Sequence, residues 1–539
     1  MQEKGSSEET KATGAAREAV KGSVFLFIGN TFSIAVSSVA SIVIARLLGP
    51  SDYGLYSVTL AVPYMMLLFT DFGVNPALVR FAARLHSERR SRLIANLIRA
   101  GVYFELVTAI LIVLIPIFLA DILALHVVNR PDATFFIRIA SFTILGSALL
   151  ATSSSVFVGL DEMDKAATFS ILSSIIKLIV SPTLIVLGFG VAGAVAGHVS
   201  GVVIAGAFGS LTALRIRESP EYRSDIYSGL LSNLTPMVRY GMPLYASTLM
   251  GGILNQYHAI VLPWFTSNVE IGNYSIATVF SAGVALLMTP ISTALFPAFS
   301  KFDPRGNLRE LKGFFLQSLR YTFLLIVPAS FFIALSSEDL VSLFYGTEYV
   351  QAPLYLRLYS TTFLLAGFSL VLTNFFNGIG RTDIPLRATL IHLCAAIPFS
   401  LLFTSFYGVV GLISATIVSA MLPIAYMAWG ARHEYGLGID TKRFTRTLMA
   451  SFLSSIPTLA STVLSHSHAI RLVLAAFVFG ATCLTIAPLL RVIEHEDVAN
   501  LRKISENVGW ASHIFVLVLS YEERILHARY RRSVNGHHA

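Results

Sequence analysis

Long hydrophobic runs recur along nearly the whole chain, and short polar or charged stretches separate them. A helix that crosses a membrane needs about 20 mainly apolar residues. Fourteen segments have this character: 22–46, 53–79, 93–124, 134–160, 166–187, 190–214, 240–265, 271–298, 313–336, 353–378, 385–406, 408–431, 446–465 and 470–490. Two pairs of them meet at tight turns, at Gly188–Gly190 and at Tyr407–Gly408. The pattern predicts an all-α polytopic membrane protein with about fourteen transmembrane helices.

The composition supports this interpretation. Of the 539 residues, 55% are hydrophobic and 13% are charged, whereas roughly 25% are charged in an ordinary soluble domain. This excludes a disordered chain and a protein that coats nucleic acid, and it argues against a soluble enzyme. The two cysteines, Cys394 and Cys483, both lie in apolar stretches, so a disulfide framework is excluded.

The basic residues are distributed unevenly between the loops. If the N-terminus is cytoplasmic and the spans alternate, 31 of the 39 Lys and Arg residues fall on the inner side and 4 on the outer side. Cytoplasmic loops of membrane proteins concentrate positive residues, so this count fits an even number of spans. We therefore expect a cell-membrane protein with both termini in the cytoplasm. The run 508–520 is too short to span, and we expect a dispensable interfacial helix there, on a basic tail.

Short motifs recur at a spacing of 217 to 219 residues. They are Gly54-Leu-Tyr56-Ser57 with Gly272-Asn-Tyr274-Ser275, Ala77-Leu78 with Ala294-Leu295, Phe157, Gly159 and Asp164 with Phe376, Gly378 and Asp383, and Gly190-Val191-Ala-Gly193 with Gly408-Val409-Val-Gly411. This spacing covers six spans. Because six is even, both copies enter the membrane in the same direction, and the motifs predict two six-helix lobes related by a parallel repeat.

The repeat divides the chain into predicted parts. They are a cytoplasmic tail at 1–21, a first lobe at 22–215, a cytoplasmic linker at 216–239, a second lobe at 240–432, two additional transmembrane helices with a preceding loop at 433–490, and a basic cytoplasmic tail at 491–539.

Four stretches resemble the polysaccharide-export branch of the multidrug/oligosaccharidyl-lipid/polysaccharide exporter superfamily. They are Ala45-Arg-Leu-Leu-Gly-Pro-Ser-Asp-Tyr-Gly-Leu-Tyr56, Asp71-Phe-Gly73, Ala77-Leu-Val-Arg80 and Gly378-Ile-Gly-Arg-Thr-Asp383. With the two six-span halves, the resemblance covers about 22–490. It implies a two-lobed flippase, like those for lipid-linked oligosaccharides and O-antigen, that moves a polyprenyl-linked sugar to the outer leaflet. The implied partners are the lipid-linked sugar, membrane lipids and glycosyltransferases or a polymerase of the same pathway.

A polyprenyl-diphosphate sugar needs cationic groups for its diphosphate. Lys177 lies at the centre of a predicted span and Arg320 about seven residues into another. Such residues are costly at membrane depth, so each should face a wet cavity or a partner. Lys177 therefore contacts the head group or pairs with Asp71 or Glu105. Arg320 reaches the diphosphate or extends to the membrane interface.

Polar residues in other spans are candidates for the sugar. Asn255 and His258 lie in one span, and Asn374 and Asn377 lie in another. Their side chains suit sugar hydroxyls, but amides also join helices to one another. Asp71 and Glu105 are candidates for ion coupling or for a structural pair. His466 and His468 have no carboxylate or cysteine near them in the sequence, so we expect no metal site, and no motif requires a cofactor.

Two other functions compete with the flippase. A cation-coupled multidrug exporter of the same fold usually needs an acidic residue deep in an early span; the first span, 22–46, has none, but Asp71 keeps this alternative open. A polymerase or ligase acting on the same lipid carrier would tend to have large outer loops with Arg or His. The longest predicted outer loop, about 337–352, has neither. We therefore expect a transporter and not an enzyme.

Overall fold

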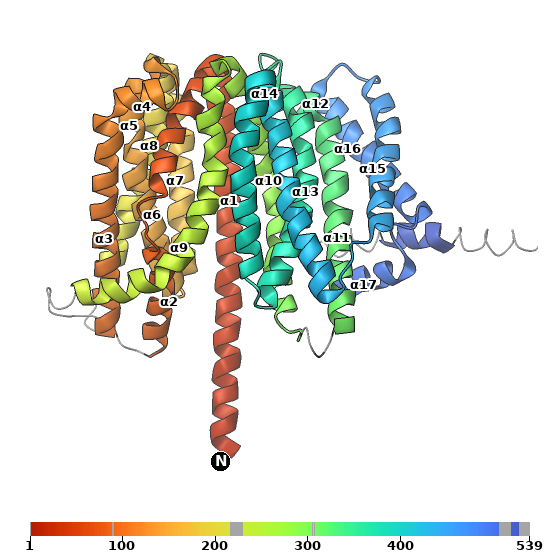
Figure 1. The fold of residues 1–539 in the computed structure, drawn as a ribbon, viewed down its shortest axis with the longest axis horizontal. Helices are drawn as coiled ribbons and strands as arrows, with labels where there is room; N and C mark the ends of the chain where they lie inside the picture. The colour runs from red at the N-terminus through yellow and green to blue at the C-terminus, as the bar shows by residue number, and fades with distance from the viewer. Residues whose placement is uncertain are drawn as a thin grey trace, which may run out of the picture. The chain divides into compact units, whose positions relative to one another are not determined.

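The computed structural model describes residues 2–88, 91–215, 230–303, 306, 308–505 and 519–527, and every regular element in these residues is a helix (Figure 1). The first half contains α1 (Gln2–Leu67), α2 (Val74–Ser87), α3 (Ser91–Phe118), α4 (Ala120–His126), α5 (Thr134–Ala140), α6 (Phe142–Gly159), α7 (Met163–Leu184), α8 (Gly190–Arg215) and α9 (Leu230–Val261). Short turns η1 (Pro131–Ala133), η2 (Ile185–Phe189) and η5 (Leu262–Trp264) join some of them.

The second half contains α10 (Asn268–Phe299), α11 (Leu308–Leu335), α12 (Ser337–Tyr345), α13 (Ala352–Gly378), α14 (Asp383–Tyr435), α15 (Thr441–Thr462), α16 (His468–Leu489) and α17 (His495–Ser505). Within the described ranges, 9 helical segments are long and apolar enough to cross a membrane. Three of them contain an internal break, at Gly49, at Gly188–Gly190 and at Gly408. The prediction of an all-α polytopic membrane protein is confirmed, and the count of fourteen spans stays a prediction.

The helices form two compact units. Unit 1 contains Met1–Ser275 and Ser400–Leu412, and unit 2 contains Ile276–Phe399 and Ile413–Ala539. The core of unit 1 includes Leu78 and Phe157, and the core of unit 2 is rich in phenylalanine, with Phe315 and Phe376 fully buried. The lobe boundaries predicted from the repeat stay a prediction.

The repeated motifs adopt the same backbone conformation in both copies. Gly190 has φ 49° and ψ −129°, and Gly408, 218 residues later, has φ 55° and ψ −132°. Positive φ favours glycine, so the motif keeps glycine where the chain reverses between two helices. The turns after α6 and α13 also match, because Glu162 N–H donates to Phe157 O and Arg381 N–H donates to Phe376 O, both at 2.8 Å.

Three predicted spans are interrupted in the structure. The span predicted at 53–79 breaks after Leu67 and resumes at Val74, with φ 46° at Phe72 and φ 83° at Gly73. A Cβ atom at Gly73 would lie within 3.0 Å of the Gly241 backbone, so α9 packs directly on the break. The spans predicted at 93–124 and 134–160 are likewise each two helices, α3 with α4 and α5 with α6. Hydrophobic length alone did not indicate these breaks.

The tail after α16 packs on unit 2. Val492, Ile493 and Val498 are buried with Ala450 and Ala487, and Leu519 and Leu526 join the same cluster. Most of the predicted interfacial helix, 508–520, lies outside the described residues. The buried tail residues nevertheless argue against our expectation that the tail is dispensable, because removing them exposes the apolar faces of α15 and α16.

Candidate functional site

Lys177 lies on α7 beside His198 of α8 in unit 1, and its side chain is half-buried. His198 is almost fully buried, and its Nε2 shares a 2.9 Å hydrogen bond with the hydroxyl of Tyr64 from α1. A Cβ atom at Gly201 would lie 2.7 Å from Ser173 O and 3.5 Å from Lys177 Cβ, so α8 packs tightly on α7 here. We call Lys177, His198 and Tyr64 the Lys177 site.

Two serine side chains of α7, Ser174 and Ser181, are hydrogen-bonded to neighbouring helices. Ser33 Oγ of α1 donates to Ser170 O at 3.0 Å and shares a 2.7 Å hydrogen bond with Ser174 Oγ. Ser181 Oγ donates to Ala194 O of α8 at 3.1 Å. Lys177 Nζ, by contrast, makes no hydrogen bond or ion pair with any described residue. The serines join the helices, and the ammonium group is left for a ligand or for water.

Asp71 and Glu105 lie next to the break between α1 and α2. Asp71 Oδ1 accepts a 2.7 Å hydrogen bond from Asn75 N–H, so this carboxylate caps the first turn of α2. Glu105, on α3, is 1% exposed, and its carboxyl group interacts with Asp71 and Thr70. Neither carboxylate forms an ion pair with Lys177 in the described part of the chain. We call Asp71 and Glu105 the carboxylate pair.

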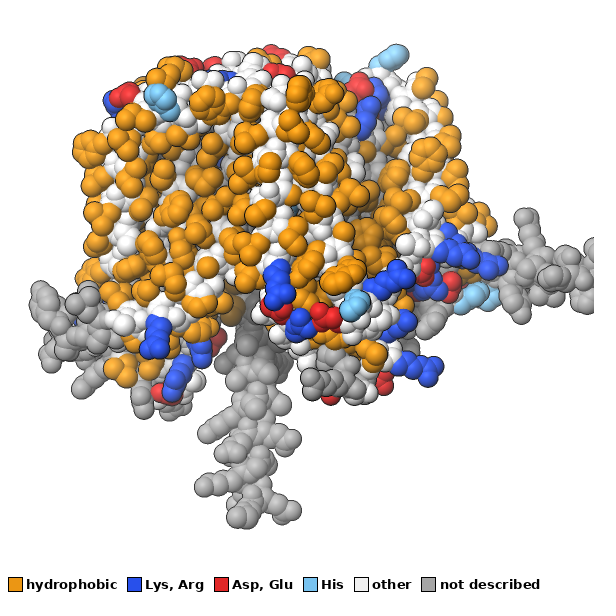
Figure 2. All heavy atoms as spheres, in the orientation of Figure 1, with side chains coloured by type: hydrophobic (Ala, Val, Ile, Leu, Met, Phe, Trp, Pro, Cys, Tyr) orange, Lys and Arg blue, Asp and Glu red, His pale blue; other side chains and the backbone are white. Residues whose placement is uncertain are grey.

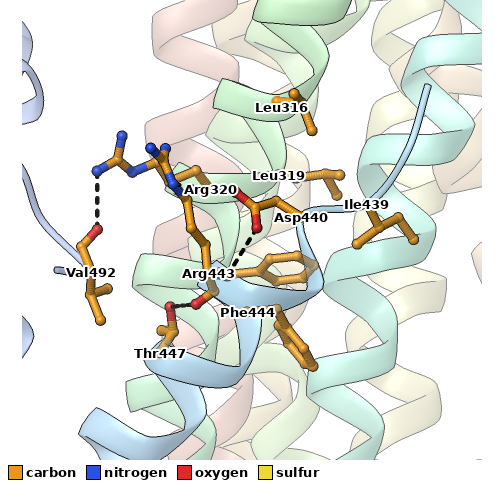
Figure 3. A pocket seen from close by; sticks show the side chains of 10 residues that line it. Leu316, Leu319, Arg320, Ile439, Asp440, Arg443, Phe444, Thr447 and Val492 are labelled. Carbon is orange, nitrogen blue, oxygen red and sulfur yellow. Dashed lines mark hydrogen bonds and ion pairs between the residues drawn. The ribbon is translucent and has the colours of Figure 1, made fainter. Parts of the chain in front are cut away.

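Arg320 lines a small cavity of unit 2, and its guanidinium is engaged there by the tail. Its guanidinium pairs with Asp497 of α17 and donates to Val492 O at 3.1 Å. Figure 3 shows the side chain of Arg320 pointing toward Val492, away from Leu319 and Ile439. The neighbouring Arg443 pairs with Asp440 at 3.3 Å and with Glu494 at 3.4 Å. The arrangement supports a structural role for Arg320 at the tail.

The candidate polar residues for the sugar lie in both units. In unit 1, Asn255 is exposed and His258 Nε2 lies 2.5 Å from the Tyr257 hydroxyl. In unit 2, the Asn374 side chain donates to Ser292 Oγ at 2.9 Å and to Leu370 O at 2.8 Å, so it joins α13 to α10. Asn377 is half-buried. Lys177, Asn255 and His258 therefore belong to one unit, and Arg320, Asn374 and Asn377 belong to the other.

One polar cluster was missed in the sequence. His468 Nδ1 lies 2.8 Å from Asp339 Oδ1, and Arg471 Nε lies 3.2 Å from the same oxygen. Asp339 is 2% exposed. No carboxylate lies near His468 in the sequence, but packing of α12 against α16 brings Asp339 next to it. The cluster fastens α12 to α16.

The family of the chain follows from its sequence matches. Residues 43–354 match the family described as polysaccharide biosynthesis protein, which is more than half of the chain. The chain belongs to the polysaccharide biosynthesis protein family. It is 21% identical over 402 residues to the "Probable low-salt glycan biosynthesis flippase Agl15" of Haloferax volcanii, covering 74% of this chain and 80% of that protein. It is 21% identical over 448 residues to the "Lipopolysaccharide biosynthesis protein WzxC" of Escherichia coli, covering 82% of this chain and 86% of that protein.

Solved structures show the same fold. This polysaccharide biosynthesis protein matches the inward closed conformation of the lipid II flippase MurJ with a TM-score of 0.71 at 16% identity, covering 87% of this chain and 99% of that chain. An inward-facing MATE family multidrug resistance transporter matches with a TM-score of 0.62, covering 75% and 94%. Together with the family match and the two relatives, these structures confirm the resemblance to the polysaccharide-export branch of the exporter superfamily.

Proposed function

We propose that this protein moves a polyprenyl-(di)phosphate-linked oligosaccharide or polysaccharide unit from the cytoplasmic to the outer leaflet of the cell membrane by alternating access. Both termini are cytoplasmic in this proposal, as the distribution of basic residues favours. Glycosyltransferases supply the substrate on the inner side, and a polymerase or transferase uses it on the outer side. The names of the relatives favour this function over multidrug export.

The observation that carries the proposal is the position of Lys177. An ammonium group in the middle of a membrane helix costs roughly 2.5–3.5 kcal/mol on insertion scales, and a compensating contact normally accompanies it. No described residue makes that contact. A substrate phosphate supplies two or more negative oxygens, and the hydrogen bonds of a charged pair are stronger than those of a neutral one. We infer that Lys177 binds the phosphate part of the substrate during transport.

We further propose that the carboxylate pair couples transport to proton or cation movement. Glu105 is buried next to Asp71, and two carboxylates in one site repel each other unless a proton or cation lies between them. The pair adjoins a helix break, and interrupted membrane helices commonly hold the ion sites of transporters. The multidrug exporter alternative would use the same pair, so the transported substrate, and not the ion, distinguishes the two functions.

The test of the function uses the protein reconstituted in liposomes with radiolabelled lipid-linked oligosaccharides isolated from the same cells. Lys177→Ala should lower the flipping rate by about tenfold to hundredfold, because hydrogen bonds to charged groups contribute about 1.5–3 kcal/mol. Lys177→Arg should recover part of the rate, since the charge is kept but the shape differs. Lys165→Ala is the matched control, because this lysine lies on the same helix and is paired with Glu162 at its exposed end.

Three results would contradict the proposal. Full flipping by Lys177→Ala would remove this residue from the mechanism. Poor folding of Lys177→Ala, with recovery in the double variant Lys177→Ala/Asp71→Ala, would show instead that the two residues form a structural pair. Transport of cationic drugs without transport of lipid-linked sugar would support the multidrug exporter.

A further inference from the structure

A cavity of about 790 Å³ opens in unit 2 where α11 and α15 begin and α14 ends. Because α11 and α14 are long and apolar enough to cross a membrane, the cavity at their ends lies where the hydrophobic and polar parts of a bilayer meet. The side chains that line it include Lys312, Leu316, Ala428, Trp429, Arg432 and Leu437. Figure 2 shows a group of Lys and Arg side chains along the lower edge on the right of the view, with hydrophobic side chains above them. We call this cavity the basic groove.

The basic groove has two positive charges with no matching acid. Asp440, which also lines it, is paired with Arg443, and the nearby Glu434 is paired with Arg381 at 2.5 Å. Lys312 and Arg432 are exposed, and neither forms an ion pair with any residue that the structure describes. Asp440 and Glu434 are therefore already neutralised, whereas Lys312 and Arg432 keep their charges without a paired acid among the described residues.

The neighbouring cavity does not offer an anion the same free cations. Leu316, Ile439 and Asp440 line both cavities, and the arginines of the second one, Arg320 and Arg443, are held by the tail and by Asp440 (Figure 3). Both arginines of the second cavity are therefore occupied. Of the described residues that line these two cavities, only Lys312 and Arg432 of the basic groove are cations without an ion-pair partner.

An aromatic side chain and an apolar wall complete the basic groove. Trp429 is 61% exposed, and its ring stacks on His433 with the ring centres 5.2 Å apart. Exposed tryptophan is typical of the membrane–water interface, where its ring lies at the level of the lipid head groups. Leu316, Ala428 and Leu437 offer apolar surface next to the two cations. The groove thus combines contacts for a phosphate with contacts for the upper part of an acyl chain.

We propose that the basic groove binds the head group of an anionic glycerophospholipid from the surrounding leaflet, with Lys312 and Arg432 on the phosphate and Trp429 against the glycerol and upper acyl carbons. Basic pockets between membrane helices bind anionic head groups in this way. The occupant is a resident bilayer lipid and not the transported molecule, so the inference stands independently of the proposed function.

The test measures quenching of tryptophan fluorescence by brominated lipids in the full-length protein. Brominated phosphatidylglycerol should quench the fluorescence at lower mole fractions than brominated phosphatidylcholine, and Trp429→Phe should remove this difference. Lys312→Gln/Arg432→Gln should reduce the preference for phosphatidylglycerol by about tenfold to thirtyfold, because each basic residue near the surface contributes about 1 kcal/mol. Lys301→Gln/Arg309→Gln is the matched control, since both residues are exposed near the same helix ends but do not line the groove.

The outcomes distinguish a phospholipid head group from free inorganic phosphate as the group that the basic groove binds. Equal quenching by the two brominated lipids, or a preference that survives Lys312→Gln/Arg432→Gln, would overturn the proposal. Loss of the preference on adding millimolar inorganic phosphate at constant ionic strength would show a site for free phosphate and would also overturn it. Size-exclusion profiles identical to that of the unmodified protein confirm that the variants fold.

Discussion

Glu105 and Asp339 are both buried carboxylates, but their surroundings differ. Asp339 is contacted by His468 and Arg471, so its charge has cationic or donating partners. Glu105 has Thr70 and a second carboxylate, Asp71, beside it. A buried charge without a cation is strongly destabilising, whereas a paired one can be tolerated. The charge of Asp339 is thus compatible with a stable fold, whereas a charge on Glu105 would destabilise it, although both residues are acidic and almost inaccessible.

We expect Glu105→Gln to keep the protein folded and to abolish the dependence of flipping on a pH gradient. The amide keeps the shape of the carboxyl group but cannot bind and release a proton. Flipping rates with and without an imposed gradient measure this effect. Asp339→Asn is the control: it should lower thermal stability, because Arg471 loses its ion-pair partner, and should leave the response to the gradient unchanged. A gradient response retained by Glu105→Gln would exclude this residue from coupling.

Part of the candidate site could be predicted from the residues alone. Lys177 was identifiable because a lysine in the middle of an apolar span is costly wherever it lies. Its neighbours were not identifiable, because His198 and Tyr64 come from other helices and only packing brings them together. The same reason hid the contact of Arg320 with Asp497, which is 177 residues away.

At the scale of elements, helices α1 and α10 cross through two glycines of the repeat. A Cβ atom at Gly54 would lie within 3.0 Å of Asn268 O, and one at Gly272 would lie within 3.0 Å of Pro50 O. Pro50 and Asn268 are themselves 218 residues apart, the spacing of the repeat. Gly54 thus contacts Asn268, and the equivalent Gly272 contacts the equivalent Pro50, so the crossing is symmetric. Neither helix has room for a side chain at these two glycines.

Gly272→Ala should weaken this crossing, whereas Gly283→Ala on the same helix should not. A Cβ at Gly283 meets nothing within 4 Å, and alanine favours helix over glycine by up to about 1 kcal/mol. Thermal unfolding followed by fluorescence-detected size exclusion should show a lower transition temperature for Gly272→Ala and an equal or higher one for Gly283→Ala. Equal transition temperatures for the two variants would contradict the close crossing.

For the whole molecule, the class of fold followed from hydrophobic length and from the repeat, since both are visible in the sequence without any knowledge of tertiary contacts. The breaks at Phe72 and Gly73 did not, because the break depends on the packing of α9 against it. The docking of the tail was missed for a similar reason. Its apolar residues are too few to span a membrane, and only their contact with α15 and α16 shows that they are buried.

The docked tail should respond to pH through Glu522. Burial and the nearby Asp497 raise the pKa of Glu522 to about 7 from a normal value of 4.5. The docked state therefore holds a proton that the released state loses, so docking weakens as the pH rises from about 4.5 to about 7. We expect the docking equilibrium to fall by about tenfold to hundredfold over this interval.

Hydrogen–deuterium exchange of α17 at several pH values, corrected for the intrinsic exchange rate, measures this change. Glu522→Gln should remove the pH dependence, because the amide does not titrate. Glu523→Gln is the control, since Glu523 is partly exposed and faces Arg502 at 3.6 Å. Exchange that stays independent of pH in the unmodified protein would show that Glu522 does not control docking.

The crossing at Gly54 and Gly272 also bears on the ancestry of the chain. Two equivalent positions of a repeat contact each other only where a local twofold axis passes between them. In a symmetric homodimer, a residue on the twofold axis likewise contacts its own copy in the other subunit. If the two predicted six-helix lobes descend from one half-length ancestor, that ancestor would have paired with itself through this glycine, and gene duplication followed by fusion would have kept the contact unchanged. Glycine at this position would then be older than the covalent link between the halves.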